Sequence, residues 1–185
     1  MTAEEALQQF LTALGLDTND PDLKDTPSRV ANLFRQDLLD GYQKDPAKIL
    51  ANTFPTQGAN LVCIGGIDFE STCPHHLLPV LGVAKIGYLP VGKVVGFSQI
   101  VDLVEALSHR LVLQEQLGVQ ICNAIVEHVG SPFVACQLTA NQLCMMVRGN
   151  KRPRSAVTTY AFAGGRAGDP MFKEMFFRAK EERPV

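Results

Sequence analysis

The sequence predicts an α+β protein in which helices cover one face of an antiparallel sheet. Apolar residues recur at helical spacing in the N-terminal part of the chain, whereas later runs rich in valine and isoleucine are bounded by glycine and proline. Two of these strand-like runs precede a pair of helical segments, and further strand-like runs follow them. Because a helical pair separates the two halves of the sheet, helices layered on an antiparallel sheet are favoured.

The N-terminal region, residues 1–55, is expected to be helical. Residues 3–14 carry leucines and a phenylalanine at helical spacing, and Gly15 is a candidate C-cap. A second helix is expected at Thr26, which would act as the N-cap, with Pro27 as the first helical residue.

Residues 56–185 are expected to hold the sheet as a second domain. Ser98 is a candidate N-cap for the first of the two inserted helices, and Gly130 is expected to end the second. A break between these helices is expected at residues 108–113. The predicted strands are residues 61–69, 80–89, 133–139, 143–147 and 156–162, and a C-terminal helix is predicted at 171–179.

The composition argues against several classes of protein. The 185-residue chain has a net charge of −2, whereas nucleic-acid binders normally carry a basic excess. No run reaches the roughly 18 apolar residues that span a bilayer, and the acidic N-terminus does not resemble a signal peptide. We expect a cytoplasmic protein without membrane or nucleic-acid partners. In that reducing setting, cysteines paired with histidines indicate metal binding or catalysis more often than disulfides. Of the five cysteines, Cys63, Cys122 and Cys136 are expected to be core thiols.

A thiol and two imidazoles lie close together in the stretch that ends in Cys73, Pro74, His75 and His76. With Cys144, Cys73 and His76 could occupy three corners of a zinc tetrahedron whose fourth corner stays open for water, as in catalytic sites. Zinc would lower the pKa of that water towards 7, and His75 beside it could transfer protons. Considered locally, the same residues also fit loop histidines and packed core thiols.

Two further features indicate ligand binding. Glu115, which follows Gln114 at a helix start, could accept two parallel N–H donors from a guanine-like base. The alternative is a solvated helix start, where glutamate favours the helix dipole. The basic stretch 148–155 could bind phosphate, and its alternative is a solvated turn.

Together, these motifs resemble GTP cyclohydrolase I. Their order and spacing match the family over most of the chain. The matching segments are Asp25-Thr26-Pro27-Ser28-Arg29-Val30, Ser71-Thr72-Cys73-Pro74-His75-His76, Gly96-Phe97-Ser98-Gln99, Gln114-Glu115 and Gln142-Leu143-Cys144-Met145-Met146-Val147-Arg148-Gly149.

The resemblance implies the tunnelling fold, in which two helices are inserted between the second and third strands of a four-stranded antiparallel sheet. It implies zinc (Zn2+) bound by Cys73, His76 and Cys144, and a homo-oligomer, typically a decamer, with active sites between subunits. In the family, zinc-activated water attacks C8 of the guanine of GTP, formate leaves, and 7,8-dihydroneopterin triphosphate forms. The expected small-molecule partner is therefore a purine nucleotide or pterin.

The resemblance also implies roles for the remaining site residues. Glu115 would hold the guanine edge with Gln114 beside it, and His75 would shuttle protons. Contacts with ribose or phosphate are implied for Ser98, Arg29 and Arg148.

The chain departs from the family at positions that handle protons and phosphate. Gln142 replaces the second catalytic histidine, and an amide can orient groups but cannot act as acid and base. Gln99 and Asp102 stand where the family has lysine and arginine, which weakens the attraction for a triphosphate. Pro74 replaces the glutamate of the zinc loop.

Three functions are compatible with this pattern. The first is a zinc hydrolase with a changed substrate or end-point, which takes a guanine-like or pterin-like ring with fewer phosphates or stops after opening the ring of GTP. The second is an ordinary GTP cyclohydrolase I of pterin and folate biosynthesis, in which Gln142 is tolerated and Lys151, Arg152 or Arg154 supply the phosphate charge. The third is a catalytically silent paralogue that binds a pterin or purine, or serves as a regulatory or structural subunit.

Overall fold

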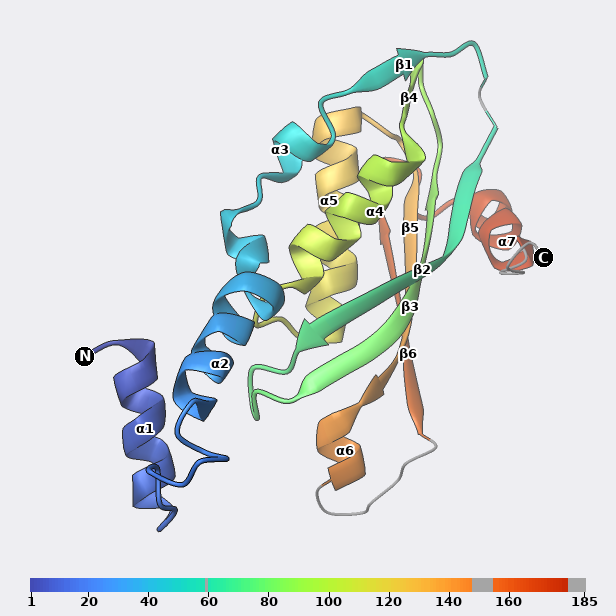
Figure 1. Ribbon diagram of the computed structural model, residues 1–185. Coiled ribbons are helices and arrows are strands. Elements are labelled where there is room, and N and C mark those ends of the chain that lie inside the picture. Colours follow the sequence, from blue (N-terminus) through green and yellow to red (C-terminus); the bar gives the residue numbers. More distant parts are fainter. Residues whose placement is uncertain (59, 148–154, 180–185) are drawn as a thin grey trace, which may run out of the picture. The chain divides into compact units, whose positions relative to one another are not determined.

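The computed structural model describes residues 1–58, 60–147 and 155–179 (Figure 1). Two compact units form, Met1–Asp40 and Gly41–Val185. The domain boundary expected after residue 55 stays a prediction. In the described part of the chain, no helix is both long enough and apolar enough to cross a bilayer.

The first unit contains two helices, and a capping box begins the first of them. The hydroxyl of Thr2 accepts from the N–H of Glu5 at 3.2 Å, while the Glu5 carboxylate accepts from the N–H of Thr2 at 2.8 Å. The helical segments are α1 (Ala3–Ala13), α2 (Thr26–Leu33) and a π-helical turn at Phe34–Leu38.

The start of α2 differs from the expectation by one residue. The N–H of Arg29 donates to the carbonyl of Asp25, so helical bonding begins one residue before Thr26 and Asp25 is the N-cap. Pro27 lies in the first turn, where its missing N–H costs no helical hydrogen bond. Gly15 has a φ of 80° just after α1, as expected of a glycine that ends a helix.

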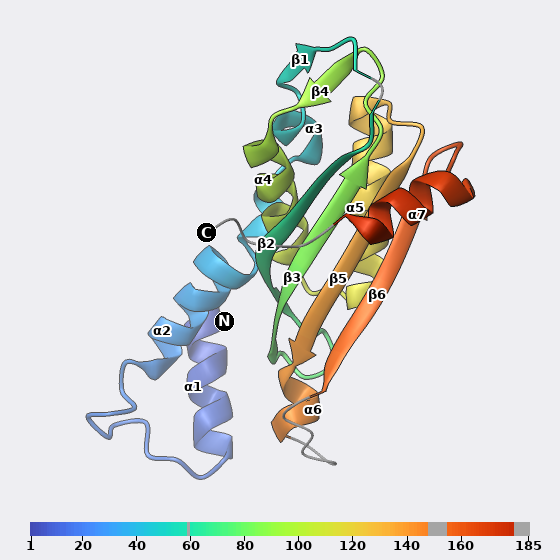
Figure 2. The same ribbon diagram turned by 90° about the vertical axis from the view of Figure 1, so that its right-hand side faces the viewer.

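The second unit is built on a four-stranded antiparallel sheet (Figures 1 and 2). Two long helices are inserted between its second and third strands, and this order confirms the α+β class and the tunnelling fold. In spatial order, the sheet consists of β2 (Val62–Thr72), β3 (Pro79–Tyr88), β5 (Val134–Gln142) and β6 (Ala156–Ala163), and the inserted helices are α4 (Phe97–Ser108) and α5 (Gln114–Val129).

Helices cover both faces of this sheet rather than the one face that we expected. Figure 2 shows α7 across the sheet from α4 and α5. Side chains alternate along β5, so Cys136 and Leu138 join the large core under α4 and α5, whereas Ala135 joins a smaller aromatic cluster. Phe172 and Phe176, one helical turn apart on α7, close that cluster. The smaller elements are a 3₁₀ turn (Asp40–Gln43), α3 (Pro46–Ile49), β1 (Thr53–Pro55), β4 (Lys93–Val95), α6 (Leu143–Val147) and α7 (Pro170–Arg178).

Two other predictions about the second unit were wrong. Residues 143–147 form α6 instead of a strand, because a short apolar run fits either structure and β5 already ends at Gln142. Helix α4 begins at Phe97, with Gly96 rather than Ser98 as its N-cap. There the side-chain oxygen of Gln99 accepts from the N–H of Gly96 at 3.0 Å. The two-stranded β1–β4 sheet was not predicted at all.

Candidate metal centre and ligand pocket

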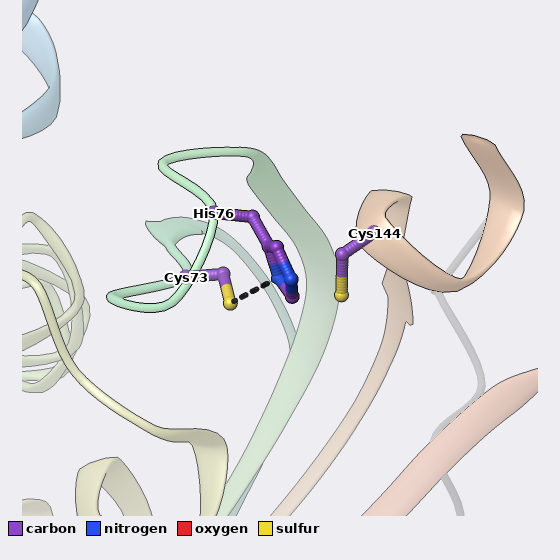
Figure 3. Close-up of side chains that lie close together, drawn as sticks. All are labelled: Cys73, His76 and Cys144. Atoms are coloured by element: carbon purple, nitrogen blue, oxygen red, sulfur yellow. Dashed lines mark hydrogen bonds between the residues drawn. The ribbon is translucent and has the colours of Figure 1, made fainter. Parts of the chain in front are cut away.

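The connection between β2 and β3 forms half of the candidate metal centre. The N–H of Cys73 donates to the carbonyl of Leu78 at 2.9 Å, and the N–H of Leu77 donates to the carbonyl of Cys73 at 2.9 Å. Leu77 has a left-handed φ of 53°, a conformation that costs a leucine on the order of 1 kcal/mol. The tight turn brings the side chains of Cys73 and His76 together (Figure 3).

Helix α6 supplies the third candidate ligand, Cys144. The Sγ of Cys73 lies 3.9 Å from Nδ1 of His76, and one ligand atom from each of the three residues lies within 4.8 Å of the others. Zinc bonds of about 2.0–2.3 Å at tetrahedral angles hold such atoms roughly 3.5–3.8 Å apart, so a small contraction is enough. Two thiols and one imidazole therefore fit zinc, with one coordination position left for water.

The surroundings of the Cys144 thiol raise its pKa and so favour its neutral form. Burial raises the pKa of the Cys144 thiol, and the neighbouring Cys73 thiol raises it further. A divalent cation held between the sulfurs would reverse both effects, because it stabilises thiolates directly. Metal binding at these residues would thus release protons.

A pocket of about 230 Å³ opens beside the candidate ligands. Its apolar walls, which were not expected from the sequence, come from β2, β3, α5, β6 and the connection between α4 and α5. The period-2 alternation of the strands could have identified some of them, such as Phe69 and Val80. The predicted site residues that line the pocket are Cys73, His75, Gln114, Glu115, Gln142 and Cys144, and its apolar walls include Phe69, Val80, Val112, Leu117 and Val157.

Two amides within this pocket are hydrogen-bonded to each other. Gln114, at the start of α5, is 6% exposed, and its Nε2 donates to the carbonyls of Leu138 at 3.0 Å and Val157 at 2.9 Å. The Nε2 of Gln142 donates to the Oε1 of Gln114 at 2.8 Å. The side chain at the position of the missing histidine is therefore tied to the sheet through Gln114.

Among the described residues, Ser98, Arg29 and His76 were predicted for the site but do not line the pocket. Ser98 lies on the exposed side of α4, as does Asp102. Arg29 is exposed in the first unit, where it pairs with Asp25 at 3.2 Å. Arg148, together with the rest of the basic stretch 148–154, lies outside the described residues.

Gln99 also has a role that the sequence did not reveal. Besides accepting from Gly96, it donates from its Nε2 to the carbonyl of Ile49 at 2.5 Å. This side chain thus joins the start of α4 to the last residue of α3.

Fold and site together define a class: a tunnelling-fold protein with a candidate metal centre beside a ligand pocket. The family model of GTP cyclohydrolase I matches residues 3–181. The chain therefore belongs to the GTP cyclohydrolase I family, which consists of hydrolase-type enzymes.

Relatives named GTP cyclohydrolase 1 cover nearly the whole chain. The one from Chromobacterium violaceum is 37% identical over 178 residues, which is 96% of this chain and 86% of that protein. The one from Hyperthermus butylicus is 40% identical over 178 residues, which is 96% of this chain and 89% of that protein.

Solved structures are more distant. The apo form of an archaeosine synthase QueF-Like aligns with a TM-score of 0.49 at 21% identity, covering 59% of this chain and 98% of that one. An E. coli dihydroneopterin aldolase in complex with neopterin aligns with a TM-score of 0.44 at 15% identity, covering 57% of this chain and 99% of that one.

Proposed function

We propose that this protein is a zinc-dependent hydrolase of GTP cyclohydrolase I type in which water attacks the imidazole C8 of a guanine nucleotide or a related purine or pterin. We further propose that its substrate or end-point differs from the family reaction. The observation that carries the proposal is the convergence of Cys73, His76 and Cys144 beside a pocket that also contains Glu115 and Gln142.

Zinc held by the three ligands would supply an activated water at neutral pH. Glu115, in the first turn of α5, offers a carboxylate that can accept from the ring N–H and the exocyclic amine of guanine. This pair of charge-assisted hydrogen bonds would fix the base. His75 lines the pocket next to the metal ligands and can accept or return protons as the imidazole ring opens.

The side chains available for proton transfer support a changed end-point of the reaction. The family reaction needs several proton transfers after the ring opens, and the second histidine of the family is Gln142 here. A carboxamide has no proton to exchange near pH 7. Among the described residues that line the pocket, His75 is therefore left as the one imidazole that can transfer protons. Ring opening with release of formate needs fewer such transfers than the later rearrangement of the ribose carbons.

Phosphate and ribose contacts would come from Ser98, Arg29 and Arg148. In a homo-oligomer with active sites between subunits, a decamer in the family, neighbouring copies can supply side chains that do not reach the pocket of their own chain. Gln99 and Asp102 stand where the family has lysine and arginine, and the absence of these two cations favours a ligand with fewer phosphates.

An ordinary GTP cyclohydrolase I is the second candidate. It is favoured by identities of 37–40% over nearly the full chain to proteins of that name. In this case Gln142 would be tolerated, and a water chain would carry the protons.

One experiment separates these candidates. The purified protein is loaded with zinc, and formate release is measured with GTP, GDP, GMP, guanosine and reduced pterins, alongside the ultraviolet spectrum of the product. We expect formate from a guanine derivative without the spectrum of dihydroneopterin triphosphate. Formation of dihydroneopterin triphosphate from GTP at ordinary family rates would contradict the changed end-point, and absence of formate from every compound would leave only the catalytically silent paralogue.

A further inference from the structure

The orientation of the Gln114 amide is fixed by the backbone of the sheet. Its Nε2 lies within hydrogen-bond distance of two main-chain carbonyls, at 3.0 Å from Leu138 and 2.9 Å from Val157, and the hydroxyl of Thr159 lies at 3.3 Å. Main-chain carbonyls can only accept, so the end of the side chain that faces them must be the NH2 group. Exchanging the nitrogen and oxygen of Gln114 would set an oxygen against two carbonyl oxygens in a buried site.

This orientation determines how the next amide is presented. With its nitrogen committed to the sheet, Gln114 turns its Oε1 towards Gln142, and the two side chains meet at 2.8 Å. An oxygen accepts only, so Gln142 must present its own NH2 group there. Within the described residues, no group hydrogen-bonds to the Oε1 of Gln142, whose side chain lines the pocket.

We propose that Gln114 is a positioning residue that acts on the ligand through Gln142. In this arrangement the carbonyl oxygen of Gln142 and the second hydrogen of its NH2 group are left for a ligand. The pocket therefore favours a molecule that carries a hydrogen-bond donor, an N–H or O–H group, at the point where it meets the Oε1 of Gln142. The nature of the remaining ligand, a guanine derivative or pterin, rests on the proposed function, whereas the orientation of the two amides does not.

The alternative is direct recognition of the ligand by Gln114. Its two N–H groups already have three acceptors around them, and its Oε1 already accepts from Gln142. A donor on the ligand would have to share the Oε1 of Gln114 with Gln142 and reach a side chain that is only 6% exposed. The indirect role keeps every one of these hydrogen bonds.

The first test needs no substrate. Gln142→Glu would set a carboxylate against the Oε1 of Gln114, whereas Gln142→Met only removes the hydrogen bond. At pH 8 we expect Gln142→Glu to melt several degrees below Gln142→Met, and we expect this gap to close when Gln114→Met is added to both. A Gln142→Glu protein that melts at or above the wild-type temperature would mean that Gln114 presents its N–H groups instead, and the inference would be overturned.

The second test follows the ligand, with GTP as the probe and formate release as the readout. We expect Gln142→Met and Gln114→Met each to raise KM at least tenfold while kcat changes less, and the double variant to be no worse than the poorer single variant. A purely structural role for Gln114 would lower the amount of folded protein and leave KM unchanged. Asn141→Ala is the control, because Asn141 is exposed and its side chain points away from Gln142 along β5.

The two tests separate the two ideas. If no variant releases formate, the proposed function fails, and the melting comparison still decides the orientation of the amides. If formate is released but the KM effects of the two substitutions multiply in the double variant, the proposed function stands and the positioning role is wrong.

Discussion

The metal side and the amide side of the pocket are built in different ways. The metal side is local in part: Cys73 and His76 lie three residues apart in one tight turn, whereas Cys144 comes from the short helix α6 that follows β5. The amide side uses long-range contacts, since Gln142 reaches Gln114 across 28 residues and Gln114 reaches the carbonyl of Val157 across 43. A local motif thus reveals the pair Cys73 and His76, whereas the pairing of the two amides is visible only in the folded chain.

This difference indicates which changes the fold can absorb. A metal ligand has few substitutes, because zinc demands particular donor atoms at fixed distances. The fold can accept a different side chain at a neighbouring position if that side chain satisfies its buried neighbours, and Gln142 does so by pairing with Gln114. Gln99 likewise serves the start of α4 through Gly96 and Ile49.

The largest effect is expected on the metal side. Cys144→Ser should lower the zinc content well below one per chain and reduce formate release roughly 10³-fold or more, because the activated water depends on the metal. Metal analysis after dialysis and a formate assay measure both quantities. Cys63→Ser is the control, since Cys63 packs in the cluster under α7, and it should keep its zinc. Full activity in the zinc-depleted Cys144→Ser protein would refute the proposed centre.

The next largest effect is expected at Glu115, which we propose binds the base of the ligand. Glu115→Gln should raise KM for a guanine substrate about 100-fold, because one accepting oxygen is replaced by an NH2 group that faces a donor. Zinc content should not change. Glu127→Gln, on the exposed side of the same helix, is the matched control. Equal KM values for the two variants would mean that Glu115 is only a solvated helix-start residue.

A smaller effect is expected from restoring the cations of the family. Asp102→Arg should raise kcat/KM for GTP about threefold to tenfold at low salt and less at high salt, because exposed charges are screened. Asp102→Asn should give an intermediate gain. No change in kcat/KM with either variant would remove the charge argument for fewer phosphates.

Gln99→Lys should behave differently from Asp102→Arg. Lysine cannot accept from the N–H of Gly96, so the variant loses the bond that begins α4. We expect a loss of about 1 kcal/mol in the free energy of unfolding, measured by thermal or urea denaturation. Unchanged stability would mean that the cap contributes little.

The smallest effect concerns the strained turn of the metal side. Leu77→Gly removes the cost of the left-handed φ but adds conformational freedom to the unfolded chain, so the unfolding free energy should change by less than about 1 kcal/mol. Leu77→Val should be the less stable variant, because a β-branched residue tolerates this conformation poorly. Equal stability of the two variants would indicate that the turn relaxes, and zinc content would show whether the ligands move with it.

Much of the fold could be predicted from local patterns. The spacing of apolar residues gave α1, α4 and α5, and the β-branched runs gave β2, β3 and β6 within a few residues. Short segments were the failures: Leu143–Val147 has too few residues for its period to be read, and β1 is too short to stand out. Helix α7 was predicted, but its position on the second face of the sheet was not.

The sequence by itself identified the candidate ligands, because Cys73 and His76 are close in the chain and their side chains offer donor atoms that suit zinc. The fold brings Cys144 beside them. The sequence also determined that no imidazole stands at position 142. Only the tertiary structure decided which way the amide of Gln142 points. The direction of the Gln142 amide depends on Gln114, whose own direction depends on carbonyls from two strands, and hydrogen bonds between such distant residues leave no periodic trace in a sequence.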